Sequence, residues 1–134
     1  MKDLIKYRIE RADNSIKEAE FLLNGNMSLE SVMNRLYYAM FYAVLGLLEE
    51  RGLGTSKHSH AISLFDKEFV KAGIFNKELS ETFHKAFDLR QKGDYEKSSL
   101  ITKDNIDEIL PKAKHFVNEI KKYLLNNYNL IIQD

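Results

Sequence analysis

The spacing of apolar residues along the chain predicts four long helices and a shorter one. Apolar positions recur every three or four residues, the period of one helix face, over residues 2–24, 29–51, 60–72, 77–92 and 103–126. The segments between them are short, and the whole chain holds a single proline. Four to five helices joined by short loops predict an all-α fold, an up-and-down antiparallel bundle.

Residue types that begin or end helices stand at the expected boundaries. Candidate N-caps precede the second, fourth and fifth segments, and a glycine follows each of the first four; these residues are Ser28, Asn76 and Thr102, then Gly25, Gly52, Gly73 and Gly93. We therefore expect the fourth helix to stop at Gly93. Pro111 predicts either a bend in the last helix or a restart near it. The apolar tail at residues 127–134 is expected to dock on the body or on a partner chain.

The second predicted helix is apolar nearly all the way round. Its apolar run, residues 36–48, is too short to span a membrane of roughly 20 residues' thickness, so we expect burial on several faces at the centre of the bundle. Arg35, Tyr38 and Tyr42 share one edge of it at i, i+3 and i+7, with Asn34 beside them. These side chains either satisfy one another structurally or line a binding site.

Composition limits the classes of function. The 134 residues predict one domain, with a core over about residues 3–126. There is no cysteine, which excludes thiolate metal sites and favours an intracellular, cytoplasmic location. The 20 basic and 20 acidic residues balance on either side of His60, so bulk charge does not hold nucleic acid. Any such contact has to be local.

The stretch FDLRQKGDYEK, residues 87–97, carries the first candidate chemistry. Arg90 is followed closely by Asp94 and Tyr95. In one interpretation Arg90 only interacts with the carbonyl groups at a helix C-terminus. In the other it grips a phosphate while Asp94 or Tyr95 handles a proton. The histidines add little, because His58 and His60 have no third ligand at supporting spacing, and we expect no metal site and no cofactor.

Three stretches together resemble the HEPN family, the "higher eukaryotes and prokaryotes nucleotide-binding" domains. They are NRLYYAMFYAVLGLLEERG, KHSHAISLFDKEFVKAG and LRQKGDY, and they stand in the family's order. The resemblance implies a helical bundle that forms a homodimer with its site in the dimer cleft. It also implies a toxin–antitoxin-like setting with a minimal nucleotidyltransferase as partner, and active members that cut RNA without a metal.

The family's signature is an arginine followed, after four to six residues, by a histidine near the end of the fourth helix. Arg90 takes the arginine position, whereas Tyr95, Glu96 and Lys97 stand where histidine belongs. Loss of the imidazole removes the best acid or base near neutral pH. The resemblance thus favours binding of nucleotide or RNA phosphate over cleavage. If the chain is a metal-independent endoribonuclease, Arg90 would stabilise the developing charge and Tyr95 would assist proton movement.

Two further interpretations stay open. The chain could be a non-catalytic protein-interaction bundle in which Arg90 is purely structural, or Tyr95 could be a substrate that the partner enzyme nucleotidylates. A formal match to the signature also runs from Arg51 to His58. It spans the loop after the second helix, away from Arg90, and we interpret it as coincidence.

Overall fold

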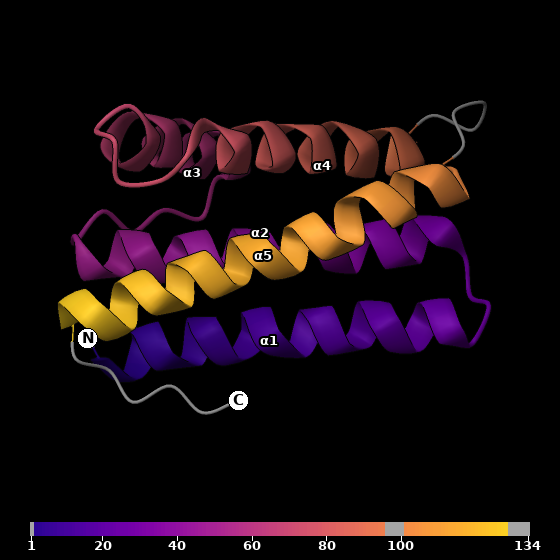
Figure 1. Cartoon of the computed structure of the whole chain (residues 1–134), viewed down its shortest axis with the longest axis horizontal. Helices are drawn as coiled ribbons and strands as arrows, with labels where there is room; N and C mark the ends of the chain where they lie inside the picture. Colours follow the sequence, from indigo (N-terminus) through magenta and orange to yellow (C-terminus); the bar gives the residue numbers. More distant parts are fainter. Residues whose placement is uncertain (1, 96–100, 129–134) are drawn as a thin grey trace.

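Four long helices form an up-and-down bundle, and a shorter helix lies across one end (Figure 1). The computed structural model describes residues 2–95 and 101–128, with the backbone alone for residues 92–95 and 128. The helices in chain order are α1 (Lys2–Asn24), α2 (Leu29–Glu50), α3 (His58–Phe65), η1 (Asp66–Val70), α4 (Lys77–Tyr95) and α5 (Lys103–Tyr128). The predicted all-α antiparallel fold is confirmed.

Helix α2 is the centre of the bundle. It packs against α1, α3, α4 and α5, and its residues are buried on every side apart from one polar edge. The expectation that this helix is buried on several faces is therefore confirmed. In the part of the chain that the structure describes, no helix is both long and apolar enough to cross a membrane.

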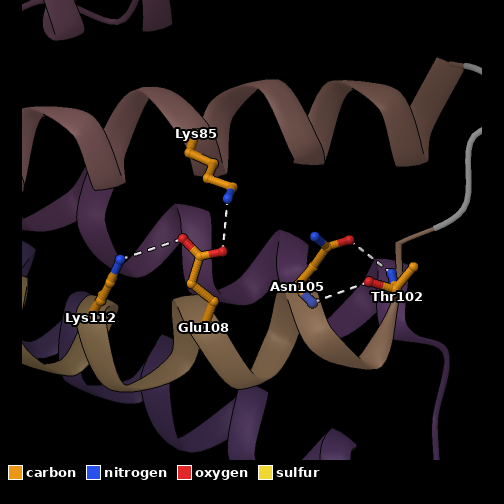
Figure 2. Close-up of polar contacts among 5 residues, drawn as sticks. All are labelled: Lys85, Thr102, Asn105, Glu108 and Lys112. Atoms are coloured by element: carbon orange, nitrogen blue, oxygen red, sulfur yellow. Dashed lines mark hydrogen bonds and ion pairs between the residues drawn. The ribbon is translucent and has the colours of Figure 1, made fainter.

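Side-chain caps begin three of the helices, as the sequence predicts. Ser28 Oγ and Asn76 Oδ1 accept hydrogen bonds from backbone N–H groups in the first turns of α2 and α4, at 3.2 and 2.9 Å. At the start of α5 the bonds are reciprocal (Figure 2): Asn105 N donates to Thr102 Oγ1 at 3.2 Å, and Thr102 N donates to Asn105 Oδ1 at 2.9 Å. Each cap satisfies backbone donors that the helix leaves without a partner.

Helix α1 ends directly before Gly25, as expected, and glycines end two further segments, while the expected stop at Gly93 is wrong. Gly52 and Gly73 adopt left-handed φ angles of 71° and 82°, which glycine reaches without steric cost. After α1 it is Asn26, not Gly25, that is left-handed, with φ 56°. Gly93 has helical backbone, and α4 continues through it to Tyr95. A glycine inside a helix costs only about 1 kcal/mol relative to alanine, so it does not end one by itself.

The third helical segment also differs from the prediction. It begins at His58 rather than His60, and over Asp66–Val70 it becomes a π-helix, with Lys71 N donating to Asp66 O at 2.8 Å. The Asp66 carboxylate lies 2.6 Å from Ser80 Oγ and 2.6 Å from His84 Nε2 of α4. His84 therefore pairs with a carboxylate from the neighbouring helical segment.

Helix α5 is continuous through Pro111, so the expected restart there is wrong.

An ion pair joins α5 to α4 (Figure 2): Lys85 Nζ lies 2.7 Å from Glu108 Oε1. Within α5, Lys112 Nζ lies 3.4 Å from Glu108 Oε2. The hydrogen bond from Lys85 lowers the pKa of the Glu108 carboxyl. The apolar tail lies outside the described residues beyond Tyr128.

Close packing of α1 on α2 gives the first prediction. A Cβ atom at Gly46 would lie 3.3 Å from Ile9 Cδ1 and 3.6 Å from Arg8 Cβ. We expect Gly46→Leu to lower the free energy of unfolding by about 1–3 kcal/mol, because overpacking forces neighbouring side chains and backbone apart. Urea denaturation followed by circular dichroism measures the change.

Gly46→Ala is the matched control for that substitution. Its single methyl displaces only the flexible end of Ile9, and the higher helix propensity of alanine, about 1 kcal/mol, offsets the crowding. A Gly46→Leu protein as stable as the Gly46→Ala protein would show that α1 and α2 are not in close contact there.

Candidate functional site

Two arginines from different helices meet on one tyrosine ring. Arg90 of α4 donates from Nη2 to Tyr38 Oη of α2 at 3.4 Å, and its Cζ lies 5.4 Å from the centre of the Tyr38 ring. Arg35 of α2 has its Cζ 5.0 Å from the same ring. All three side chains are half-buried. The electron-rich face of a tyrosine attracts cations, and here it gathers two.

Neighbouring polar groups hold Arg35 in place. Asn34 Oδ1 accepts hydrogen bonds from Arg35 Nε at 3.1 Å and from Nη2 at 2.8 Å. Glu18 of α1 lies 3.4 Å from Arg35 Nη1. The structure thus brings Asn34, Arg35 and Tyr38, the three candidate binding residues, together with Arg90.

A third arginine extends this surface toward α1. Arg11 Nη2 donates to Tyr42 Oη at 2.9 Å, and its Cζ lies 4.9 Å from the centre of that ring. The hydrogen bond raises the pKa of the Arg11 guanidinium further. We call Arg11, Arg35, Arg90, Tyr38 and Tyr42 the arginine–tyrosine cluster. It presents three cations, and Glu18 lies beside it as a counter-charge.

A buried tyrosine and a histidine lie directly beside the cluster. Tyr37 is fully buried, and its Oη lies 2.7 Å from His58 Nδ1, a hydrogen bond whose direction depends on the histidine tautomer. The His58 ring stacks on Phe41, with centres 4.2 Å apart and planes 8° apart. Burial raises the pKa of Tyr37, which therefore stays a phenol. Burial and the nearby Arg90 lower the pKa of His58.

His58 and Arg90 share the same pair of aromatic rings. The His58 ring centre lies 5.6 Å from the centres of both Tyr37 and Tyr38, and Arg90 Cζ lies 5.6 and 5.4 Å from them. The expectation that His58 lies away from Arg90 is therefore wrong. Its apparent signature partner Arg51 lies elsewhere, 4.5 Å from the centre of the Phe69 ring.

Sequence reasoning missed His58 because it weighed the residue only as a metal ligand and as the histidine of a coincidental match that starts at Arg51. One signal pointed to it: a tyrosine inside the apolar part of α2 needs a hydrogen-bond partner from outside that helix.

Asp94 and Tyr95 continue the backbone of α4, and their side chains lie outside the described part of the structure. Among the described residues no group of three or more His, Cys, Asp or Glu side chains is placed to hold a metal ion.

Comparison with known proteins identifies the family of this chain. The family model of the HEPN domain matches residues 5–123, nearly the whole chain. The chain belongs to the HEPN domain family. The HEPN match includes every helix that contributes to the arginine–tyrosine cluster, and it includes His58.

Curated relatives of this HEPN chain cover most of its length. A UPF0332 protein of Thermotoga maritima is 39% identical over 90% of this chain and 91% of its own. Two proteins of Methanocaldococcus jannaschii carry the name "Putative toxin". One is 36% identical over 88% of this chain and 80% of its own length. The other is 30% identical over 92% of this chain and 91% of its own length.

The lowered pKa of His58 predicts a pH dependence of stability. In the unfolded chain the pKa of His58 is near the ordinary 6.5, and in the folded protein it is lower. The folded state therefore binds a proton on His58 less tightly, and the contribution of His58 to stability is fully present above pH 6.5. That stability is lost as the pH falls from there through the folded-state pKa. We expect His58→Gln to weaken the fall in melting temperature between neutral and mildly acidic pH.

His60→Gln is the control, since His60 is exposed and, among the described residues, its Nδ1 meets only Thr55 Oγ1, at 3.1 Å. Thermal melts of the two variants and the wild type across this pH range make the test. Equal pH dependence in the wild type and His58→Gln would contradict the assignment.

Proposed function

We propose that this HEPN protein is a toxin-like module that binds nucleotide or RNA phosphate on Arg90 and Arg35. The observation that carries the proposal is the pair of guanidinium groups, 5.4 and 5.0 Å from the centre of one tyrosine ring. Arginine presents planar, paired donors that match phosphate oxygens, and it stacks on aromatic rings while doing so.

The arrangement of charge supports this function. Two like charges near one ring repel each other, and the low dielectric of a partly buried site strengthens that repulsion. An anion bound between the two guanidinium groups would remove this repulsion, and the energy released would add to its binding affinity. Since the chain as a whole has no net charge, attraction of a polyanion has to come from such a local concentration of arginine. A purely structural Arg90 would need no second arginine beside it.

The homodimer and the partner enzyme belong to the same proposal. A two-fold axis near the arginine–tyrosine cluster would bring two copies of it together and double the positive charge facing one phosphate backbone. Two relatives that carry the name "Putative toxin" support a toxin–antitoxin-like setting. In that setting the expected partner is a minimal nucleotidyltransferase.

Removing one guanidinium tests the binding site. We expect Arg90→Ala to weaken binding of a fluorescent single-stranded RNA by about tenfold or more, since each strong phosphate contact is worth about 1–3 kcal/mol. Arg35→Ala should weaken it less, because Glu18 already offsets part of the charge of Arg35. Fluorescence anisotropy at several salt concentrations gives both the affinity and its salt slope. The slope should fall by about 0.7 for each lost contact.

Arg51→Ala is the matched control for those variants. Arg51 also lies over an aromatic ring, that of Phe69, and it has a carboxylate partner, Glu68, at 3.9 Å. The variant removes the same charge from another part of the surface. If it weakens RNA binding as much as Arg90→Ala does, binding depends on total charge and the proposed site is wrong.

The dimer is tested separately. We expect light scattering after size-exclusion chromatography to give twice the mass of one chain at the concentrations that bind RNA. Wild type and Arg90→Ala should give the same mass, since the proposal makes Arg90 a ligand-binding residue. A monomer that still binds RNA through Arg90 would refute the dimer and leave the binding site standing.

A further inference from the structure

We propose that His58 acts as the general base for RNA cleavage at the Arg90 site, so that the imidazole comes from the start of α3 instead of the end of α4. This inference rests on the proposed function, because it requires RNA phosphate to be bound by Arg90. It concerns a residue outside the arginine-to-histidine spacing that marks active members of the family. It rests on where His58 lies and on how its ring is held.

The hydrogen bond to Tyr37 leaves the other ring nitrogen of His58 for a ligand. Nδ1 lies 2.7 Å from the hydroxyl of a fully buried tyrosine, so this side of the ring faces the core. Nε2 lies on the opposite side of the imidazole, and no described residue forms a hydrogen bond with it. The side chain as a whole is half-buried, which leaves part of it accessible.

Contacts on several sides fix the orientation of the imidazole. Phe41 stacks on the ring at 4.2 Å, and the Tyr38 ring meets it nearly edge-on, with planes 88° apart. A catalytic base works best when a third group holds it in one orientation and one tautomer. Here Tyr37 takes that part: when Nδ1–H donates to Tyr37 Oη, Nε2 carries the lone pair that accepts a proton. The imidazolium formed afterwards keeps the same bond.

The charges around His58 suit a base that is neutral at physiological pH. The described titratable or charged groups against its ring are Tyr37 and Tyr38 from α2, and Arg90 from α4. Burial holds the pKa of His58 below its ordinary value, and Arg90 adds to this because it repels a second positive charge. The unprotonated imidazole therefore predominates near neutral pH.

The chemical step follows from this arrangement. His58 Nε2 takes the proton of a ribose 2′-hydroxyl while the 2′ oxygen attacks the adjacent phosphorus, forming the P–O2′ bond. The P–O5′ bond breaks, and the leaving 5′ oxygen takes a proton from water. Arg90 stabilises the charge that builds up on the phosphoryl oxygens. The products are a 2′,3′-cyclic phosphate and a 5′-hydroxyl, and the imidazolium returns its proton to solvent, so no metal or redox partner is needed.

Cleavage of an end-labelled single-stranded RNA in EDTA tests the inference, with DNA of the same sequence as a substrate that lacks the nucleophile. The proteins are wild type, His58→Gln, His60→Gln and Arg90→Ala, and RNA binding is measured on the same samples. We expect His58→Gln to cut at least about 100-fold more slowly, the usual contribution of a positioned base, with RNA binding unchanged. His60→Gln should cut like the wild type, and DNA should stay intact.

Two further readouts separate catalysis from a structural effect. Added imidazole should restore part of the cleavage to His58→Ala, whereas it cannot repair a misfolded protein. The wild-type rate should fall as the pH drops through the lowered pKa of His58, because protonation removes the base, and this fall should be absent in His58→Gln. Tyr37→Phe, which loses the positioning hydroxyl, should shift that pH profile and slow cleavage less than His58→Gln does.

Three outcomes would overturn the inference. They are a His58→Gln protein that cuts like the wild type, a wild type that binds RNA through Arg90 without cutting it, and a His58→Ala protein that imidazole does not rescue. In each of them the Arg90 binding site still stands. If Arg90→Ala binds RNA as tightly as the wild type, the proposed function fails instead.

Discussion

The buried hydroxyl of Tyr37 is the constraint on which the rest of the site depends. A phenol taken into the core without a hydrogen bond costs about 1–3 kcal/mol, and α2 uses its own backbone donors and acceptors within the helix. The hydrogen-bond partner of the Tyr37 hydroxyl is His58 Nδ1, 2.7 Å away. That bond fixes the first residue of α3 against α2 and brings an imidazole beside Arg90. One core residue thereby determines the position of a polar group at the surface.

The same helix also explains why the charge is concentrated in one place. Helix α2 is buried against four other elements, so its polar residues are confined to the edge that holds Arg35, Tyr38 and Tyr42. Arginines from α1 and α4 reach this edge because the tyrosines supply both hydrogen-bond acceptors and ring faces. A protein without net charge obtains in this way a local positive surface. The tyrosine hydroxyls and rings already hold these arginine side chains, so they lose less conformational entropy when a ligand binds.

Periodicity and local chemistry explain which features were predictable. The edge formed by Arg35, Tyr38 and Tyr42 follows from helical spacing, and the Ser28, Asn76 and Thr102 caps follow from local hydrogen bonding. Tyr37 and His58 lie on different elements, and only the packing of α3 on α2 brings them together. The predicted stop at Gly93 was wrong because propensity is only one contribution to helix stability. A glycine inside a helix is unfavourable, but its cost is small enough for the favourable interactions of the rest of α4 to outweigh it.

A fixed spacing between two catalytic residues along one helix reflects a requirement in space. The proposed cleavage needs a guanidinium and an imidazole near the same phosphate, whichever elements supply them. In this chain Arg90 keeps its place on α4, while an imidazole reaches the same pair of aromatic rings from α3. The absence of histidine from the end of α4 therefore does not mean that the site lacks one. The hydrogen bond that holds His58 also satisfies the core, so selection for stability and selection for activity would act on the same two residues.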